Sequence, residues 1–400
     1  MQRRQFLRTS AGAASALMGH ATLLAASRAG RQRLLVVFLR GGYDCASLLV
    51  PTGSSFYYES RPTIHIPRPG AEQGALALDS DWGLHPALAA SMLPLYQKKQ
   101  LAFVPFAGSD NLSRSHFETQ DSIELGQPLA GAKNYRSGFM NRLAQELGSH
   151  GGDLQPIAFT STLPLILRGT LDVPNTALTP AAGRATLDER QTRAIAAMYA
   201  GTPLAVSVNE GFATRDEVAR SMQGEMDAAS REALSTKGFE STARRMARLM
   251  ATRYAMGFVD VGGWDTHVGQ GASTGPLANR LEELGRGLAA YAQEMGPLWA
   301  STVVVVMSEF GRTFRENGNH GTDHGHGSVY WVLGGGVAGG RIAGAQQTLT
   351  ASTLFQNRDY PVLNDYRAVL GGLFADMYGL GSAAVGRVFP GVRPALLRLV

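Results

Sequence analysis

The 400-residue sequence predicts an α/β fold in which helices cover both faces of a central, mostly parallel sheet. Its composition, 44% hydrophobic and 17% charged, is typical of a globular chain that can bury a sizeable core. Several apolar runs have strand length and do not alternate with polar residues, which favours strands buried on both faces. Helical patterns separate these runs, as parallel strands require crossover connections.

The expected strands follow one another along most of the chain. The first, LLVVFL, comes directly after Arg33 and is closed by Gly41 and Gly42. Further strands are expected at residues 101–108, 156–161, 254–263, 302–311 and 328–336. Helices are expected at residues 85–99, 139–147 and 277–295, and again from His116 onward. The last strand leads into LGGGVAGGR, which lacks the G-x-G-x-x-G spacing and precedes no helix, so a hairpin or tight loop is expected there.

The stretch from about 180 to 250 differs from the rest because it carries much of the charge, in amphipathic segments such as LDERQTRAIAAMYAG. We interpret it as a helical insertion or cap with solvated faces. No period of about 20 to 50 residues repeats, and no low-complexity linker divides the chain. Residues 30–400 are therefore expected to form one domain that contains this helical insertion.

The N-terminus has the pattern of an export signal. An arginine pair, Arg3 and Arg4, precedes Phe6, Leu7 and a weakly apolar stretch that ends in small residues. The string RRQFL resembles a twin-arginine signal, so residues 1–29 are expected to engage the Tat export machinery and direct the protein to the periplasm or cell surface. The alternative is a basic, apolar helix that belongs to the fold.

Charge and cysteine content exclude several classes of function. The formal net charge is +5, but the first 27 residues hold three arginines and no other charge, so a processed chain would carry only +2. A chain without clustered basic residues lacks the positively charged surface that nucleic-acid binding requires. No long apolar run outside the first thirty residues predicts a membrane span in the mature chain. Cys45 is the single cysteine, which excludes a disulfide framework.

Polar residues able to bind metal lie just after the carboxyl ends of the expected strands, where ligands bind in an open α/β sheet. Three histidines occur within seven residues of a glycine-rich loop, the strongest local signal. Histidine combined with carboxylate suits zinc, iron or manganese. We expect a divalent metal site of one or two ions, with zinc as the first choice. The expected ligands are Asp44, His116, Asp265, His267, Glu309, Asp323 and His324.

Three of these candidates, Asp44, His116 and Glu309, also have a simpler interpretation. Asp44, beside glycines, could be a turn residue, and His116 could be a packing histidine at the start of a helix. Glu309 ends a run of valines and could form a salt bridge with Arg312. Asp265 and His267, two positions apart, would lie on the same side of an extended segment and could reach one ion.

Ser115 precedes an expected helix and could be its N-cap, where backbone N–H groups also favour an anion. If it faces a divalent ion instead, its hydroxyl can act as a nucleophile. Arg312 could hold an anionic substrate group, with the bridge to Glu309 as the alternative.

The motifs GGYD, SRSHF, GGWDTH, SEFGRT and GTDHG occur in this order. With them the chain resembles an exported bacterial family of unassigned function in the alkaline phosphatase superfamily, loosely called sulfatase-like. The resemblance implies an alkaline phosphatase-like fold with a two-metal site at the carboxyl edge of the sheet. By position, Asp44 resembles the first metal aspartate, Ser115 stands near the nucleophile, Asp265 and His267 resemble the pair on one ion, and His324 the last histidine.

Two departures from that pattern matter. Phosphatases of the superfamily have a histidine after the late carboxylate Glu309, whereas this chain has Phe310, so a second metal would lack a ligand unless His116 or Asp323 supplies it. Cys45 stands in CASLL, without the arginine that formylglycine chemistry needs.

The resulting hypothesis is a periplasmic, metal-dependent hydrolase of small anionic phosphate or sulfate esters, with in-line displacement by Ser115. The alternative is a non-catalytic exported binding or assembly protein that keeps the fold and one metal.

Overall fold

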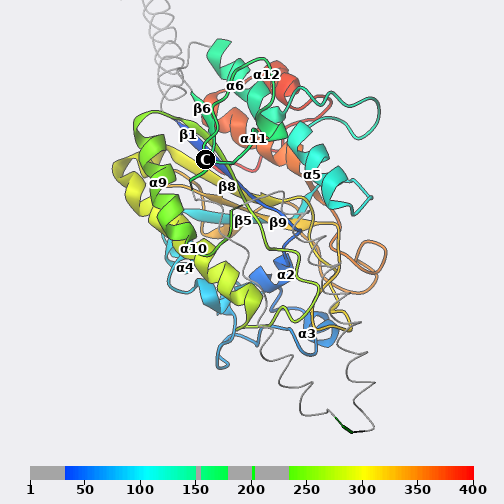
Figure 1. The fold of residues 1–400 in the computed structure, drawn as a ribbon. Helices are drawn as coiled ribbons and strands as arrows, with labels where there is room; N and C mark the ends of the chain where they lie inside the picture. The colour runs from blue at the N-terminus through cyan, green and yellow to red at the C-terminus, as the bar shows by residue number, and fades with distance from the viewer. Residues whose placement is uncertain (1–31, 150–154, 179–200, 203–233) are drawn as a thin grey trace, which may run out of the picture.

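The computed structural model describes residues 32–149, 155–178, 201–202 and 234–400 (Figure 1). The expected export signal lies outside the described residues, as does most of the expected insertion. Among the described residues, no helix combines the length and the apolar character that a membrane crossing requires.

The main sheet has the strand order β10-β5-β9-β8-β1-β7-β6, and β11 pairs with β5 at the edge. Its strands are β1 (Arg33–Leu39), β5 (Leu101–Gly108), β6 (Pro156–Ala158), β7 (Met256–Val261), β8 (Thr302–Ser308), β9 (Ser328–Leu333), β10 (Arg341–Ile342) and β11 (Asn364–Asp365). All six strands expected from the sequence are confirmed. The central pairs β1–β7 and β1–β8 are parallel, while β9 is antiparallel to both of its neighbours. The prediction of an α/β fold with a largely parallel sheet is confirmed.

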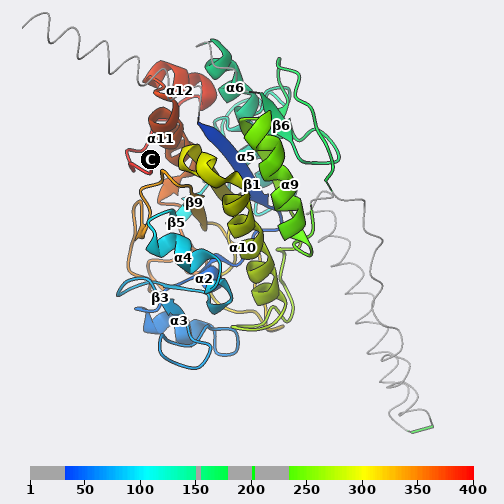
Figure 2. The ribbon, with the colours of Figure 1, turned by 90° about the vertical axis from the view of Figure 1, so that its left-hand side faces the viewer.

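Helices cover both faces of this sheet (Figures 1 and 2). Alternate side chains of β1 enter two separate apolar clusters, Leu35 and Val37 on one face and Leu34 and Val36 on the other. The first face is covered by α4 (Met92–Gln97), α9 (Phe239–Thr252) and α10 (Pro276–Met295). The second is covered by α5 (His116–Leu125), α6 (Phe139–Ser149), α11 (Tyr366–Tyr378) and α12 (Ser382–Val388).

Smaller elements complete the fold. They are α2 (Cys45–Leu48), α3 (Ser55–Ser60), the 3₁₀ turns η1 (Pro86–Leu88), η2 (Leu165–Leu167) and η3 (Gly296–Ser301), and a small sheet of β2 (Leu49–Val50), β3 (Leu76–Ala77) and β4 (Gly83–Leu84). LGGGVAGGR forms the expected loop, which connects β9 to β10.

Two expected elements differ in detail. The single helix expected at 85–99 is η1 followed by α4, because Pro94 lacks an N–H and is tolerated only in the first turn of a helix, as it is in α4. The described end of the 180–250 stretch includes α9, which packs Phe239, Met246 and Met250 in the apolar layer on the sheet and leaves its other face exposed.

Candidate metal centre

The topology brings the loops that follow β1, β5, β7 and β8 to one edge of the sheet. Strands β1, β7 and β8 run in the same direction, and their carboxyl ends lead into Gly41, Asp265 and Glu309. Strand β9 runs the opposite way, so the loop from Glu309 to its start stays at this edge. Gly41 allows a close approach here, since its φ is 117° and a Cβ on it would lie 2.7 Å from the backbone N of Asp265.

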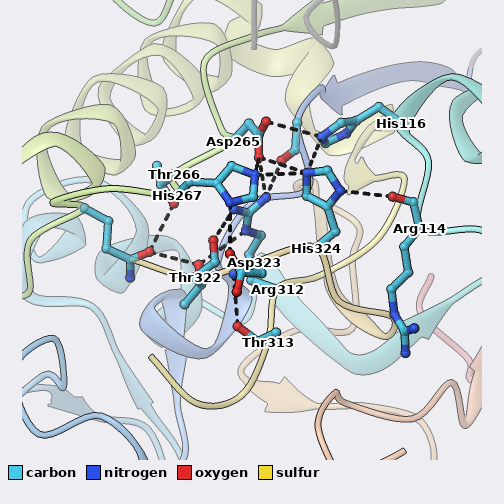
Figure 3. Close-up of polar contacts among 12 residues, drawn as sticks. Arg114, His116, Asp265, Thr266, His267, Arg312, Thr313, Thr322, Asp323 and His324 are labelled. Atoms are coloured by element: carbon cyan, nitrogen blue, oxygen red, sulfur yellow. Dashed lines mark hydrogen bonds and ion pairs between the residues drawn. The ribbon is translucent and has the colours of Figure 1, made fainter. Parts of the chain in front are cut away.

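Three histidines direct their Nε2 atoms toward one point beside Asp265 (Figure 3). His324 Nε2 lies 2.9 Å from His116 Nε2 and 3.0 Å from His267 Nε2. Asp265 Oδ1 lies 2.9 Å from His267 Nε2 and 3.3 Å from His324 Nε2, and its Oδ2 lies 3.4 Å from His116 Nε2. Four residues from three distant loops therefore meet around a shared point.

The opposite ring nitrogen of each histidine has a fixed partner that can only accept. The Nδ1 of His116 lies 2.8 Å from Glu309 Oε1, and that of His267 lies 3.1 Å from Asp323 Oδ1. The Nδ1 of His324 lies 3.0 Å from the carbonyl oxygen of Arg114. Carboxylate and carbonyl oxygens accept hydrogen bonds, so in the neutral rings the proton is on Nδ1 and the lone pair on Nε2.

This arrangement fits a divalent cation. Converging lone pairs repel one another unless a positive charge lies between them, and metal-bound histidines typically donate their other N–H to a carboxylate or carbonyl. At metal–ligand distances of about 2.0–2.1 Å, tetrahedral ligand atoms would lie about 3.3 Å apart, close to the spacing seen here. Within the described residues, His116, Asp265 and His324 form a group whose ligand atoms all lie within 4.8 Å of one another.

The pKa shifts show what the metal-free cluster does instead. Burial lowers the pKa of His116, but hydrogen bonds to Asp265 and Glu309 outweigh it and raise the pKa to about 9. Burial lowers the pKa of His324. Burial opposes ionisation of Asp265, yet its contacts with the histidines and Arg312 hold its pKa well below the ordinary range. Without a cation, the cluster therefore favours a proton on His116.

Glu309 and Asp323 were expected to bind metal directly, but the structure places both behind histidines. Glu309 is buried and also accepts from Gly41 N at 2.8 Å, Gln120 Nε2 at 2.9 Å and Ser308 Oγ at 2.9 Å. Because these contacts occupy both of its oxygens, Glu309 orients His116 and does not reach the shared point. The suggested bridge between Glu309 and Arg312 is not formed in the structure.

Asp44 does not join the cluster. Its buried carboxylate forms a paired contact with Arg61, at 2.5 and 2.9 Å, and accepts from Ser47 and Gln270 at 2.7 Å each. The alternative of a turn residue is also not what is seen, since Asp44 is neutralised by an arginine 17 positions away. An aspartate held this way already has its negative charge compensated.

Arg312 was expected to hold a substrate anion, and the structure gives it a different partner. Its side chain is fully buried, and Nη1 contacts Asp265 Oδ1 at 2.5 Å. Its other donors reach the hydroxyl and carbonyl oxygens of Thr322 and the carbonyl oxygen of Gly41. Arg312 therefore holds Asp265 through Oδ1, the oxygen that also faces His267 and His324.

Ser115 is the N-cap of α5, directly before His116. Its side chain is half-buried, and its hydroxyl makes no capping hydrogen bond with the helix. The two other histidines of the glycine-rich loop lie outside the cluster: His320 is exposed beside Thr63, and His326 stacks on Phe355.

Phe310 forms an apolar wall of the cluster. Its ring centroid lies 4.9 Å from that of His116 and 5.3 Å from that of His324. The position at which the resemblance implies a further histidine is thus filled by a hydrocarbon ring. The described residues support a single cation at this point.

Sequence reasoning missed Arg114, Arg61 and Gln270. Arg114 adopts a left-handed backbone conformation, φ 50°, its carbonyl accepts from His324, and its guanidinium is anchored by Asp359 at 2.8 Å. Such partners act through the backbone or across the fold, so no local pattern in the sequence marks them.

Comparison with known proteins gives one family and several distant folds. The model of a family described as a protein of unknown function, DUF1501, matches residues 31–389. No curated protein matches the chain.

Three of the similar solved structures share 8–9% identity with this chain. One is a protein in the alkaline phosphatase superfamily from Vibrio parahaemolyticus, with 9% identity, a TM-score of 0.34, and coverage of 76% of this chain and 60% of that one. Another is the lipoteichoic acid synthase LtaP from Listeria monocytogenes, with 8% identity, a TM-score of 0.37, and coverage of 88% and 73%. A third is Ps i-CgsB in complex with k-i-k-neocarrahexaose, with 9% identity, a TM-score of 0.35, and coverage of 88% and 74%. This chain thus spans less than two thirds of the Vibrio protein.

Proposed function

We propose that this chain, which belongs to the DUF1501 family of proteins of unknown function, is a metal-dependent hydrolase of phosphate or sulfate esters. The observation that carries the metal dependence is the convergence of three Nε2 atoms and Asp265 on one point, each ring being fixed through Nδ1. The proposal includes export by the twin-arginine pathway to the periplasm or cell surface, on the strength of the RRQFL string.

A divalent ion held there would supply Lewis-acid activation of an ester oxygen. His116, His267, His324 and Asp265 would hold it, and Arg312 would keep Asp265 in place. The partly exposed sides of His267 and His324 leave the cluster open to solvent, from which a substrate would approach.

Ser115 is the proposed nucleophile because it immediately precedes His116 and its hydroxyl is not used as a helix cap. Attack by its Oγ on phosphorus or sulfur would form a serine ester and break the bond to the leaving alcohol. The hydroxyl proton would pass to solvent, the leaving oxygen would take a proton from solvent, and water would then release phosphate or sulfate.

The experiment combines elemental analysis of the purified protein with a screen of aryl phosphate, phosphodiester and aryl sulfate substrates. We expect about one equivalent of metal and turnover that EDTA abolishes. Ser115→Ala should lose turnover and keep the metal. Ser80→Ala, at an exposed serine that lies outside the loops of the cluster, should keep both.

The packing of Phe310 against His116 and His324 favours a second candidate, a non-catalytic binding or assembly protein with one metal. Stoichiometric metal without turnover of any ester would replace the hydrolase proposal with this one.

A further inference from the structure

A cavity of about 420 Å³ lies along the outer side of α5. Four of the large hydrophobic side chains that the fold leaves exposed line it: Leu112, Phe117, Leu129 and Tyr135. Leu112 is 57% and Phe117 50% exposed, although either could have been buried in a fold of this size. Exposed apolar residues that gather around one hollow mark a binding site more often than scattered ones do.

Two of the residues that line this cavity flank Ser115 along the chain. Leu112 precedes that serine by three residues and Phe117 follows it by two, so the Cα atoms of Ser115 and Phe117 can be at most about 7.6 Å apart. Along the first turn of α5, His116 faces the interior, toward Glu309, while Phe117 faces the cavity. A ligand that reaches the metal centre past Ser115 therefore meets apolar surface directly beside it.

The charges around the cavity restrict what can occupy it. Asp110, Glu118 and Asp121 line it, opposed by Lys133. This acidic excess disfavours a second phosphate, a sulfated sugar chain or any other polyanion, because like charges near a low-dielectric wall repel. The exposed leucines and Phe117 suit an apolar group, and the acidic residues require that this group carry no negative charge.

The apolar surface continues beyond the cavity. Tyr135 also lines a second hollow of about 710 Å³ together with Leu171 and Val173. The two share this tyrosine as a common wall, so a long chain could extend from one into the other.

We infer that this cavity binds the alcohol portion of the ester and that this portion is an uncharged, apolar group. The substrate class is then the monoalkyl or monoaryl ester of phosphate or sulfate, with the charged end at the metal centre. The inference rests on the proposed function.

The test uses two series from ethyl to octyl, the alkyl phosphates and the alkyl sulfates. Within each series the head group is constant and the alkoxide leaving groups have similar basicity. We expect kcat/KM of the metal-loaded protein to rise with chain length, by up to about fourfold for each added CH₂. Leu112→Ser and Phe117→Ser should flatten this gradient. Leu396→Ser, at an exposed leucine that lines none of these cavities, is the matched control and should keep it.

Turnover without a chain-length gradient, or a gradient that survives in Phe117→Ser, would overturn the inference and leave the hydrolase proposal standing. If no ester is turned over, the hydrolase proposal fails and calorimetry with ethyl and octyl phosphate decides about the cavity. Octyl phosphate binding at least tenfold more tightly, with the difference lost in Phe117→Ser, would support an apolar occupant. Equal binding of the two would refute it.

Discussion

His116 and His324 bring their Nε2 atoms to 2.9 Å from each other, although each ring already has an acceptor at its Nδ1. Two neutral rings held in this way would place lone pair against lone pair. The contact is favourable only with a proton or a cation between the rings, and this requirement determines how the cluster should respond to mutation and to pH.

Removal of one imidazole should remove the metal. In His324→Ala the shared point loses the Nε2 that contacts both other histidines, so we expect metal affinity to fall on the order of 100-fold or more. Elemental analysis after dialysis, with circular dichroism to verify the fold, measures this. His320→Ala, in the same loop but beside Thr63, is the control, and equal metal content in the two variants would contradict the assignment.

The two carboxylates behind the histidines should differ in importance. Glu309 is buried and accepts from four donors, whereas the side chain of Asp323 is 50% exposed. Glu309→Gln places an amide among those donors, so we expect metal affinity to fall about 10- to 100-fold and the free energy of unfolding to drop by about 1–3 kcal/mol. Asp323→Asn should weaken metal binding with little loss of stability. Chelator competition and urea unfolding measure the two effects, and identical behaviour of both variants would refute the distinction.

The strands and the edge at which chemistry-bearing residues collect could be predicted because both depend on local patterns. A run such as TVVVVMS is apolar at successive positions, so it is expected to be buried on both faces of a sheet. Parallel strands of one sheet have their carboxyl ends at the same edge. The membership of the cluster could not be predicted in full. Asp44 and Asp265 both follow strands, but Asp44 meets Arg61 while Asp265 meets three histidines. That difference is set by the loop that carries Arg61 back to the sheet edge, and periodicity contains no information about it.

Arg312 should stabilise the fold through Asp265. Arg312→Gln removes the guanidinium that pairs with the buried carboxylate of Asp265, and breaking such a pair typically costs about 3–5 kcal/mol. We expect a clear loss of stability in the metal-free protein, measured by urea unfolding in EDTA, which added metal partly restores. Arg387→Gln, which breaks an exposed ion pair with Glu146, is the matched control and should change stability little. Metal-free stability equal to that of the unmutated chain would exclude this role for Arg312.

The stability of the metal-free protein should fall between about pH 6.5 and 9. The pKa of His116 is about 9 in the folded chain and about 6.5 when unfolded. The folded state therefore binds the proton more tightly, and the resulting stabilisation is complete below pH 6.5 and lost as the pH rises toward 9. It amounts to at most about 3–4 kcal/mol. Urea unfolding in EDTA measures it, and His116→Gln should lack the decline. In the metal-loaded protein the decline should also be absent, because a bound ion requires neutral His116. A metal-free profile that is flat across this window would contradict the paired His116.

Gly42 should be required for the position of Phe310. Its φ is 61°, and a Cβ at this position would lie 2.4 Å from the Phe310 ring, which contacts His116 and His324. Gly42→Ala therefore combines an unfavourable backbone conformation with a steric conflict beside the metal centre, and we expect metal binding to weaken along with stability.

Gly70→Ala isolates the backbone contribution, since Gly70 has φ 89° and nothing within 4 Å of a built Cβ. Unfolding and metal titration of the two variants give the comparison. The Gly70 variant should lose about 1–2 kcal/mol of stability with metal affinity unchanged, because its strain is far from the cluster. If Gly42→Ala also keeps its metal affinity, the Phe310 ring does not support the histidines.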